Sequence, residues 1–585
     1  MFINGFPLNS VPLNTAPASA DGPGPVVRGS SFRWRLVLVV GGVDWSHRLT
    51  GDIEVDREEN SAGLATFTLC LPSGPVVPGA WKGKTVTLDF QYEIAGVIKT
   101  SRRHTGRIVE PTWDSATRSL HCTSSDQLQQ RIEALEIAQI DALTSAASWS
   151  EDVFEPVSGR SRWDYAQERL SSLPGNLDSA PDGSLRYHDW WSLPTPTFEF
   201  ASGDVVDGSI SVSLADLDSQ TNVVEIELGH RFPRLWQHDF SYGWSHPDTG
   251  GFTGEQAFCT WTHSRTSELP TFNMVREATE SQGLTVTGIG GQRLPPTGIY
   301  CTPPQSWINN YFDDGLILQA AWTGALREVQ QVTETYKLRL EATQSVADAG
   351  AIISRMSASL QIENDRADKW ESTPFGVSGN GVILEEEGGA PERMTDLRDE
   401  PRRLAALRCV IAQGFVKVVG AHRGTTVAWD VPSAWAVDVD LIHGLRVNAQ
   451  GVLATGRCRQ IVDKFSLDTG SAITTLSVAV MLGGGTISDP LSPPPFDTSS
   501  ASPPTGGGSL GTQLGGLSTS PPYDETRNGF SGNYTTFDND EGQEPYPRRF
   551  IVPVPEIPAD IRDEWQVEIL QTYRIAIPNN ILELS

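Results

Sequence analysis

Polar and apolar residues alternate along the chain between residues 49 and 126. The apolar positions are Ile53, Val55, Ala65, Phe67, Leu69, Leu71, Val86, Leu88, Phe90 and Tyr92. A period of two predicts strands that bury one face. Polar stretches at 57–63 and 111–124 predict the turns that reverse the chain. Residues 27–130 are therefore expected to form a small, closed β module, and it contains no catalytic motif.

The same alternation returns downstream in separate pieces. Its apolar positions are Val224, Ile226, Leu228, Phe240, Tyr242, Trp244, Tyr336, Leu338, Leu340, Val427, Trp429 and Val431. The first six flank a turn-like stretch at 230–237 and predict a hairpin. Two further hairpins are expected, with turns at 448–451 and 468–471. We expect a second β module built from three pieces: 212–245, 332–342 and 402–482.

Three stretches have helical spacing instead. The first spans 128–135, and the second begins at Ser161, an N-cap with Asp164 three residues on. The strongest follows Pro401, which suits a first helical turn, and runs to residue 421. It places five apolar residues on one face: Leu404, Leu407, Ile411, Phe415 and Val418.

The remaining internal regions are predicted insertions. The first, at 131–211, has α/β character. The second, at 246–331, is rich in aromatic residues and has little period, and a third lies at 343–401.

Composition changes at both ends of the chain. Residues 1–26 are rich in Pro, Ala, Ser and Asn and predict an extended arm, with a frayed terminus as the alternative. Residues 483–547 are rich in Gly, Ser and Pro and predict a flexible linker. Residues 548–585 regain order, and Ile561, Trp565 and Ile569 lie at helical spacing. We expect this last segment to dock on another protein or to form an outer plug.

Charge and cysteine content narrow the class of protein. The 585 residues include 44 basic and 72 acidic ones, and the net charge of −28 argues against a protein that grips nucleic acid through its phosphates. Length alone predicts about three to five domains. Six scattered cysteines predict reduced thiols in strands: Cys70, Cys122, Cys259, Cys301, Cys409 and Cys458.

No targeting segment is visible. The first basic residue is Arg28, and the longest apolar run, 36–40, is far shorter than the roughly 20 residues of a membrane helix. The sequence predicts a protein made and folded in a cytoplasm, without a membrane-spanning segment.

Several short motifs could carry chemistry. Asp-Thr-Gly occurs at 248–250 and 468–470, as in aspartic proteases, where two carboxylates share a proton. The second triplet lies in an expected hairpin turn, so we interpret it as a turn. His230, His238, His246, Cys259 and His263 are candidate ligands for structural zinc. Only Cys259 and His263 have the spacing of a ligand pair.

Other motifs are weaker. Gly-x-Ser-x-Gly at 507–511 matches a nucleophile elbow, but it lies in the expected linker. Residues 288–291 fail the dinucleotide pattern, because Arg293 stands where its third glycine belongs. Four tryptophans in irregular regions could bind sugars: Trp190, Trp191, Trp236 and Trp307. In contrast, Trp34, Trp244 and Trp429 fall in strand patterns. We predict no catalytic, cofactor-binding or metal-binding residues.

Four blocks of sequence carry a resemblance. They are MFINGFPLNSVPLN, LTGDIEVDREENSAGLATFTLCLPSG, GRIVEPTWDSATRSLHCTSSD and a late helix followed by HRGTTVAWDVP and a hairpin. Together they resemble the baseplate or tail-tip hub proteins of long-tailed, siphovirus-like bacteriophages, over about residues 1–482. The resemblance implies two tube-type β-barrel domains split by insertions. It also implies a ring of three subunits that joins the hexameric tail tube to the central fibre or spike.

These observations lead to one expected function and one alternative. We expect a structural, non-enzymatic hub at the virion tail tip, assembled in the cytoplasm of a bacterial host. Its partners would be two further copies, the tail tube or distal tail protein, the fibre or spike, and other baseplate proteins. DNA would pass through an acidic lumen without specific binding. The alternative is a tail protein that binds or cleaves host-surface glycans through 246–330.

Overall fold

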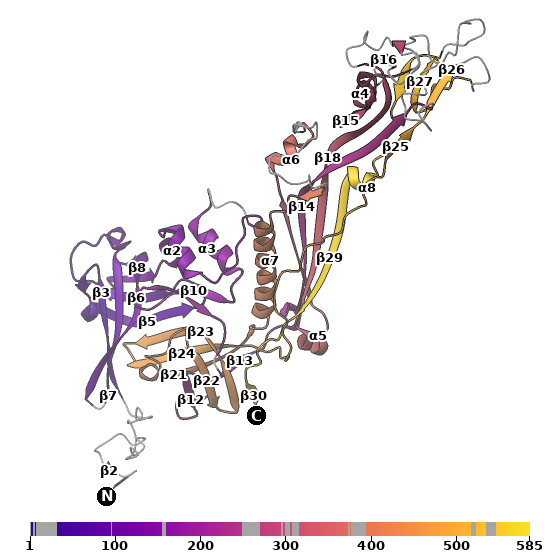
Figure 1. Ribbon diagram of the computed structural model, residues 1–585. Helices are drawn as coiled ribbons and strands as arrows, with labels where there is room; N and C mark the ends of the chain where they lie inside the picture. Colours follow the sequence, from indigo (N-terminus) through magenta and orange to yellow (C-terminus); the bar gives the residue numbers. More distant parts are fainter. Residues whose placement is uncertain are drawn as a thin grey trace.

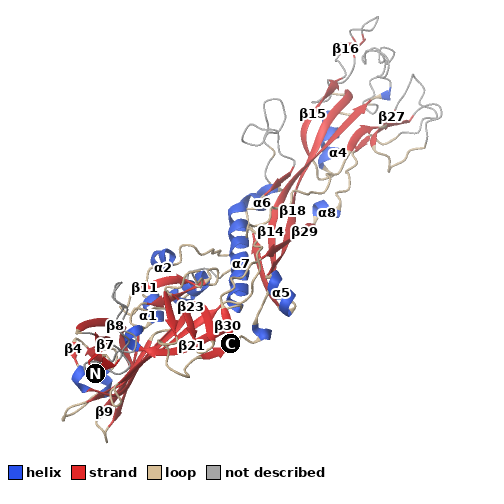
Figure 2. Cartoon of the chain, turned by 90° about the horizontal axis from the view of Figure 1, so that it is seen from below, coloured by secondary structure: helices blue, strands red, loops and turns tan. Residues whose placement is uncertain are grey.

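The computed structural model describes residues 2–3, 6–7, 32–94, 96–154, 159–192, 194–247, 269–293, 297–298, 305–306, 315–372, 375, 394–515, 522–533 and 546–585. The fold is mainly β with helical insertions, as the sequence predicted. Figures 1 and 2 show a body built on one sheet, and a second sheet that runs from it to a distal lobe. The expected N-terminal arm lies outside the described residues, apart from the short strands β1 (Phe2–Ile3) and β2 (Phe6–Pro7).

A sheet of 14 strands forms the body. Its N-terminal strands are β3 (Arg33–Val40), β4 (Val43–Asp44), β5 (Leu49–Glu58), β6 (Leu64–Cys70), β7 (Thr85–Ile94), β8 (Val97–Asp114) and β9 (Ser119–Ser125). The predicted alternation is confirmed, since Val55, Phe67 and Phe90 are at most 2% exposed. The turns are shorter than expected, because β5 and β8 continue into the polar stretches at 57–63 and 111–124.

The late hairpins belong to this same sheet. Its other strands are β12 (Phe198–Ala201), β13 (Ser211–Ser213), β21 (Thr425–Pro432), β22 (Gly444–Ala449), β23 (Val452–Ser466), β24 (Ser471–Val480) and β30 (Leu582–Leu584). Both predicted turns are confirmed, and glycines with positive φ occupy them: Gly451 at 79° and Gly470 at 71°. β5 pairs with β23 from Asp52 opposite Ser466 to Glu58 opposite Gln460.

A buried ion pair stabilises the seam, by which we mean the pairing of β5 with β23 from distant parts of the chain. Arg103 of β8 donates two hydrogen bonds of 2.8 Å to Asp463 of β23, and the two side chains are 3% and 0% exposed. Thr474 donates a further hydrogen bond of 2.7 Å to Asp463. The carboxylate is thus fully engaged, which a buried charge requires.

A second buried network lies beside the seam. Asp440 accepts hydrogen bonds from Arg57 of β5 (2.8 Å) and from Arg186 (2.7 Å), and Arg186 also binds Asp178. Burial by itself raises the pKa of Asp440, but the hydrogen bond from Arg186 and the charges of Arg57 and Arg186 outweigh burial and hold the pKa well below its usual range. These contacts join β5 to the 131–211 insertion.

That insertion has the predicted α/β character. It contains α2 (Ile137–Leu143), α3 (Arg162–Leu170), β10 (Gly175–Ser179) and β11 (Leu185–Asp189), and α1 (Leu128–Glu133) leads into it. Ser161 is the N-cap of α3, as predicted, and its hydroxyl accepts the Asp164 N–H at 3.0 Å.

The second sheet is built on two very long strands, β14 (Val223–Ser245) and β18 (Ile317–Glu341), which pair along all of β14. β15 (Thr285–Arg293), β19 (Ile353–Gln361), β20 (Met394–Asp396), β25 (Gly507–Leu510) and β29 (Glu564–Arg574) complete it. The predicted hairpin turn at 230–237 is wrong. Polar groups of this stretch bind partners on other segments instead: Arg234 pairs with Asp396, and Trp236 donates to the buried Gln330.

The strand pairing divides the pieces expected to form a second β module between the two sheets. Strands from 212–245 and 332–342 lie in the second sheet, except β13, whereas the hairpins of 402–482 lie in the first. Apolar alternation marks a half-buried strand but does not identify its neighbour, which explains the difference.

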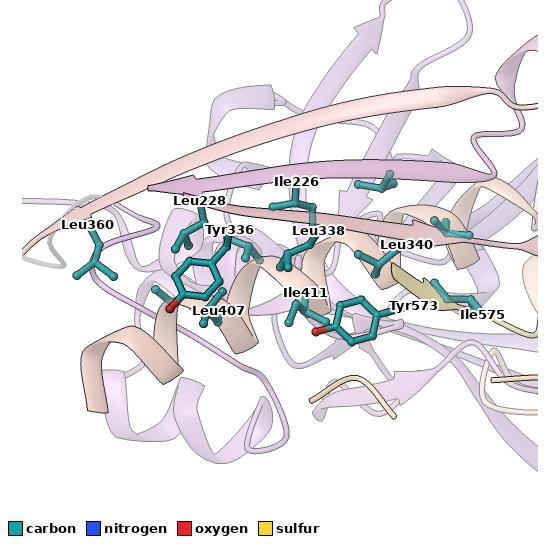
Figure 3. Close-up of a cluster of buried hydrophobic side chains, with 14 of the residues drawn as sticks. Ile226, Leu228, Tyr336, Leu338, Leu340, Leu360, Leu407, Ile411, Tyr573 and Ile575 are labelled. Atoms are coloured by element: carbon teal, nitrogen blue, oxygen red, sulfur yellow. The ribbon is translucent and has the colours of Figure 1, made fainter. Parts of the chain in front are cut away.

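The predicted helix at 401–421 is confirmed as α7 (Glu400–Ala421), with Pro401 in its first turn. It packs on β14 and β18, and Figure 3 shows Leu407 and Ile411 facing Ile226, Leu338 and Tyr573. Among the described helices, α7 alone is long and apolar enough to cross a membrane, but its packing and its buried Arg403 are those of a core helix.

Two regions expected to be separate form the distal lobe together. The expected irregular insertion supplies α4 (Phe272–Glu280), β15, the short strands β16 (Thr297–Gly298) and β17 (Gln305–Ser306), and the start of β18. The expected linker supplies β25, β26 (Thr512–Gly515) and β27 (Gly529–Asn533), and β28 (Arg549–Ile551) comes from the start of the expected docking segment. Trp244 joins them, since it contacts the ring of Phe530 and donates to Thr512 at 3.0 Å.

The expected flexible linker is therefore wrong for its described residues. Residues 483–506, here called the strap, run past the start of α7. There, three arginines donate hydrogen bonds to carbonyl groups of the strap. Arg403 binds Pro494 O (3.1 Å), Arg398 binds Asp497 O and Arg234 binds Ser499 O (3.3 Å). Prolines 490 and 493–495 lack N–H donors, so the strap cannot join a sheet, and side chains satisfy its carbonyls instead.

The predicted C-terminal helix is also wrong. Only α8 (Ala559–Arg562) is helical, and Trp565 and Ile569 lie in β29, which pairs in parallel with β18. The segment 548–585 docks on its own chain, since β30 adds to β23. The remaining helices, α5 (Thr343–Ala349) and α6 (Asp365–Trp370), flank β19.

We expect Asp463→Ala to destabilise the body strongly, because it leaves Arg103 buried without its counter-ion. Breaking a buried pair in this way costs about 3–5 kcal/mol. The midpoint of urea unfolding measures this loss. Asp468→Ala, in the exposed turn of the same hairpin, is the control and should change stability by less than about 0.5 kcal/mol. Equal shifts for both variants would contradict the role of the pair.

We expect the strap to resist proteinase K in the native protein, although its composition is that of a linker. Arg398→Ala removes a charged donor worth about 1.5 kcal/mol or more, which corresponds to about tenfold faster cleavage within 483–506. Mass spectrometry of timed digests identifies the cut sites. Lys82→Ala, at an exposed site of the body, is the control, and rapid cleavage of the unaltered strap would refute its anchoring.

Candidate assembly surface

The candidate surface for assembly with other chains is one side of the second sheet. It is formed by four strands in the order β19, β14, β18 and β29. Side chains alternate between the two sides of a sheet, so Tyr336 and Leu338 are buried beneath α7 while Lys337 and Arg339 face away. We call the side away from α7 the open face. It consists of odd-numbered residues of 223–231, 331–341 and 353–361 and even-numbered residues of 564–574.

Charges on the open face are balanced in number, and most of the cations contact a carboxylate. It has five acidic and five basic residues: Glu225, Glu227, Glu341, Glu564, Glu568, Arg231, Lys337, Arg339, Arg355 and Arg574. Arg339 contacts Glu225 (2.9 Å) and Glu341 (2.8 Å), and Arg355 lies 3.1 Å from Glu225. The surplus of acidic residues in the chain thus lies elsewhere.

Hydrogen bonds keep these groups charged. The hydrogen bond to Glu568 raises the pKa of Lys337, and hydrogen bonds from Thr333 and Gln566 lower the pKa of Glu564. Ion pairs this exposed add little to stability. Their effect is to leave few unpaired cations on the face.

The open face is hollowed into a groove of about 670 Å³ that reaches from β19 to β29. Glu227, Lys337 and Arg355 line it. Leu570 is 72% exposed at one side, and Ile353 is 42% exposed on the opposite edge strand. An apolar side chain this exposed on a charged face suggests a contact that another molecule would cover.

Both outer strands have an unpaired edge. Within the described residues, β19 pairs only with β14 and β29 only with β18. β19 has nine residues, no proline and a single charge, Arg355. Edges of this kind are usually protected in soluble proteins, because an open ladder recruits another strand. Both edges are therefore candidate sites for a neighbouring chain.

Sequence reasoning missed this surface. It placed β19 inside the expected insertion at 343–401 and gave β29 helical character. The alternation within 353–361 was the available signal, but an edge strand is defined by its lack of a neighbour, which sequence spacing does not show.

The structure separates the candidate zinc ligands. His230 and His238 lie on β14 and His246 directly follows its last residue, so they are spaced at intervals of eight residues, about 26 Å apart at the usual rise of a strand. Both ring nitrogens of His230 are hydrogen-bonded, Nδ1 to the Glu334 carboxylate (3.0 Å) and Nε2 to the carbonyl oxygen of Arg398 (2.9 Å). Cys259 and His263 lie outside the described residues. No group of three potential ligands occurs within the described part of the chain.

The other motifs lie in ordinary structural positions. Asp468 is exposed in the β23–β24 turn, as interpreted, and 248–250 lies outside the described residues. Residues 507–511 include β25 and lead to β26, so they lack the strand-to-helix turn of a nucleophile elbow. Residues 288–291 belong to β15.

Candidate sugar-binding tryptophans are largely covered. Trp236 is 2% exposed, and Trp190 lies under the Arg423 guanidinium at 4.7 Å. Trp191 packs partly buried on the core of α7, and Trp307 lies outside the described residues. Of the tryptophans expected in the core, Trp244 and Trp429 are buried and Trp34 is half-buried.

The described cysteines are free thiols, as expected: Cys70, Cys122, Cys409 and Cys458. Three lie in strands, and Cys409 lies in α7. Burial raises the pKa of the Cys122 and Cys409 thiols to about 12. Cys259 and Cys301 lie outside the described residues.

Comparison with known proteins finds only distant similarity. No protein family and no curated protein matches the chain. Among solved structures, the chain is similar to a tail protein from Neisseria meningitidis (10% identity, TM-score 0.34, 76% of this chain and 96% of that one). It is also similar to the 43 kDa tail protein of prophage MuSo2 from Shewanella oneidensis (11%, 0.34, 76% and 98%). Similarity at this level does not establish a shared function.

We expect metal chelators to leave the unfolding temperature unchanged, because the described histidines are separated or already hydrogen-bonded. Calorimetry with and without 1,10-phenanthroline tests this. A structural zinc site contributes folding energy directly, so its loss would lower the unfolding temperature clearly. A clear fall, restored by added zinc, would contradict this expectation.

Proposed function

We propose that this chain is a structural component of a bacteriophage tail, and that three copies form the hub of its baseplate. The two unpaired strand edges on the open-faced sheet are the observation that carries the proposal. A subunit with such edges is completed by other copies rather than by itself. The sequence blocks that resemble tail-tip hub proteins support this setting.

Symmetry explains why a ring of three copies would suit the junction between a tail tube and a fibre or spike. Each subunit contributes two β units to the body sheet, one from residues 33–125 and one from residues 425–480, so a trimer would offer six to a hexameric tail tube. Closed rings form when the rotation between neighbours closes. A threefold fibre or spike could then join a sixfold tube at the virion tail tip.

The charge of the chain suits a channel for DNA. Four of the five cations on the open face contact carboxylates, so few are free to displace the counterions of the phosphates. In this proposal the open face would line the channel, so that part of the wall would be neutral, whereas the net charge alone led us to expect an acidic lumen. DNA would pass without specific binding, and the proposed role involves no catalysis, cofactor or metal.

Mass and shape test the proposal. Light scattering on the purified chain should give about three times 63.6 kDa, and negative-stain images should show a ring with threefold symmetry. Antibody labelling of virions should mark the tail tip. A monomer that binds or cuts host polysaccharide would overturn the hub and favour a glycan-directed tail protein.

A further inference from the structure

The directions of the strands allow the two free edges to meet. β29 runs parallel to β18, β18 runs antiparallel to β14, and β14 runs parallel to β19. β29 and β19 therefore point in opposite directions. Rotation about an axis along the strands preserves direction, so β29 of one copy would meet β19 of the next as an antiparallel pair.

Hydrogen-bonding groups on the two edges also match. On β19, even-numbered residues bond toward β14: Ile352 O accepts from Val223 N, and Ile362 N donates to Arg231 O. Successive residues point their backbone groups to opposite sides, so those of Ile353, Arg355, Ser357 and Ser359 point to the free edge.

On β29, odd-numbered positions bond toward β18. Asp563 O accepts from Gln331 N, and Ile575 N donates to Glu341 O. The backbone groups of Glu564, Gln566, Glu568 and Leu570 therefore point outward. Beyond them, Asp489 of the strap binds Arg574 and covers the edge. The open part of β29 ends close to Leu570.

We propose that β29 of one copy pairs with β19 of the next in a single register, with Leu570 opposite Ile353 and Glu568 opposite Arg355. This inference rests on the proposed trimer and specifies its subunit joint. The register matches outward backbone groups on both strands. It also joins the two exposed apolar residues of the open face and sets an acid against a base.

Neighbouring registers lose this match. A slip of two residues sets Glu568 against Ile353 or Leu570 against Arg355, and a slip of one breaks the match of outward backbone groups. In the proposed register, Glu568 lies between Lys337 of its own chain, at 2.5 Å, and Arg355 of the next copy. Arg355 already contacts Glu225, so the ion pairs run across the joint.

The joint also sets the width of this part of the assembly. Three copies with four strands each would close a barrel of about twelve strands. Barrels of about eight strands are filled by side chains, whereas those of sixteen to eighteen hold open channels. This section would therefore be a narrow neck of the channel, with α7 on its outer side.

Cysteine cross-linking of the full-length chain tests the register. Residues in an antiparallel hydrogen-bonded pair have Cα atoms about 5.5 Å apart, within the range of a disulfide. We expect Leu570→Cys with Ile353→Cys to yield cross-linked dimers and trimers on oxidation. Within one chain these residues lie three strands apart, about 14 Å, so the bond must join two copies.

Two controls complete the test. Leu570→Cys with Ser357→Cys shifts one partner by four residues and should cross-link at least tenfold less. Glu568→Arg and Arg355→Glu should each reduce the trimer fraction severalfold while the subunit stays folded, and their combination should restore part of the trimer fraction. A trimer with no preference between the two cysteine pairs would overturn the register but keep the hub. A monomeric parent protein would overturn both.

Discussion

The rest of the structure depends on the seam between β5 and β23, which joins residues some 400 positions apart into one sheet. Arg103 and Asp463 lie at its centre with almost no exposure. A buried ion pair is weak evidence of stability, but it can specify an arrangement. A slip of one residue along β23 would turn Asp463 to the other face and leave Arg103 unpaired. The pair thus fixes which strands meet and in which register.

A second constraint follows at α7. The helix has one apolar face, so it covers one side of β14, β18 and β19 and leaves the other side to solvent. Gly414 permits close contact, since a Cβ there would lie 3.0 Å from the Ile226 side chain. The strap then crosses the start of α7, held by arginines through its carbonyls. Because α7 and the strap lie on the same side of the second sheet, the opposite side and the two outer strand edges remain available to other chains.

Features set by local chemistry could be predicted from the sequence. The α7 helix, the Ser161 N-cap, the glycine turns at 451 and 470 and the alternation in β5–β9 depend on residues close in the chain. The errors share another cause. The 230–237 stretch is strand because Asp396 and Gln330 satisfy its polar groups, and the strap is ordered by arginines about 90 to 270 residues away. At 561–569, helical and strand periods both fit, and pairing with β18 decides.

The candidate surface could not be predicted for a related reason. A free edge is a property of a finished sheet, and no spacing of residues reveals which strand will lack a neighbour. Two free edges of opposite direction on one sheet also restrict the assemblies available. Head-to-tail pairing uses both edges on every copy, and it yields a ring when the curl of the sheet returns to its start and a filament when it does not. The curl of four strands therefore decides between a hub of fixed size and an open fibre.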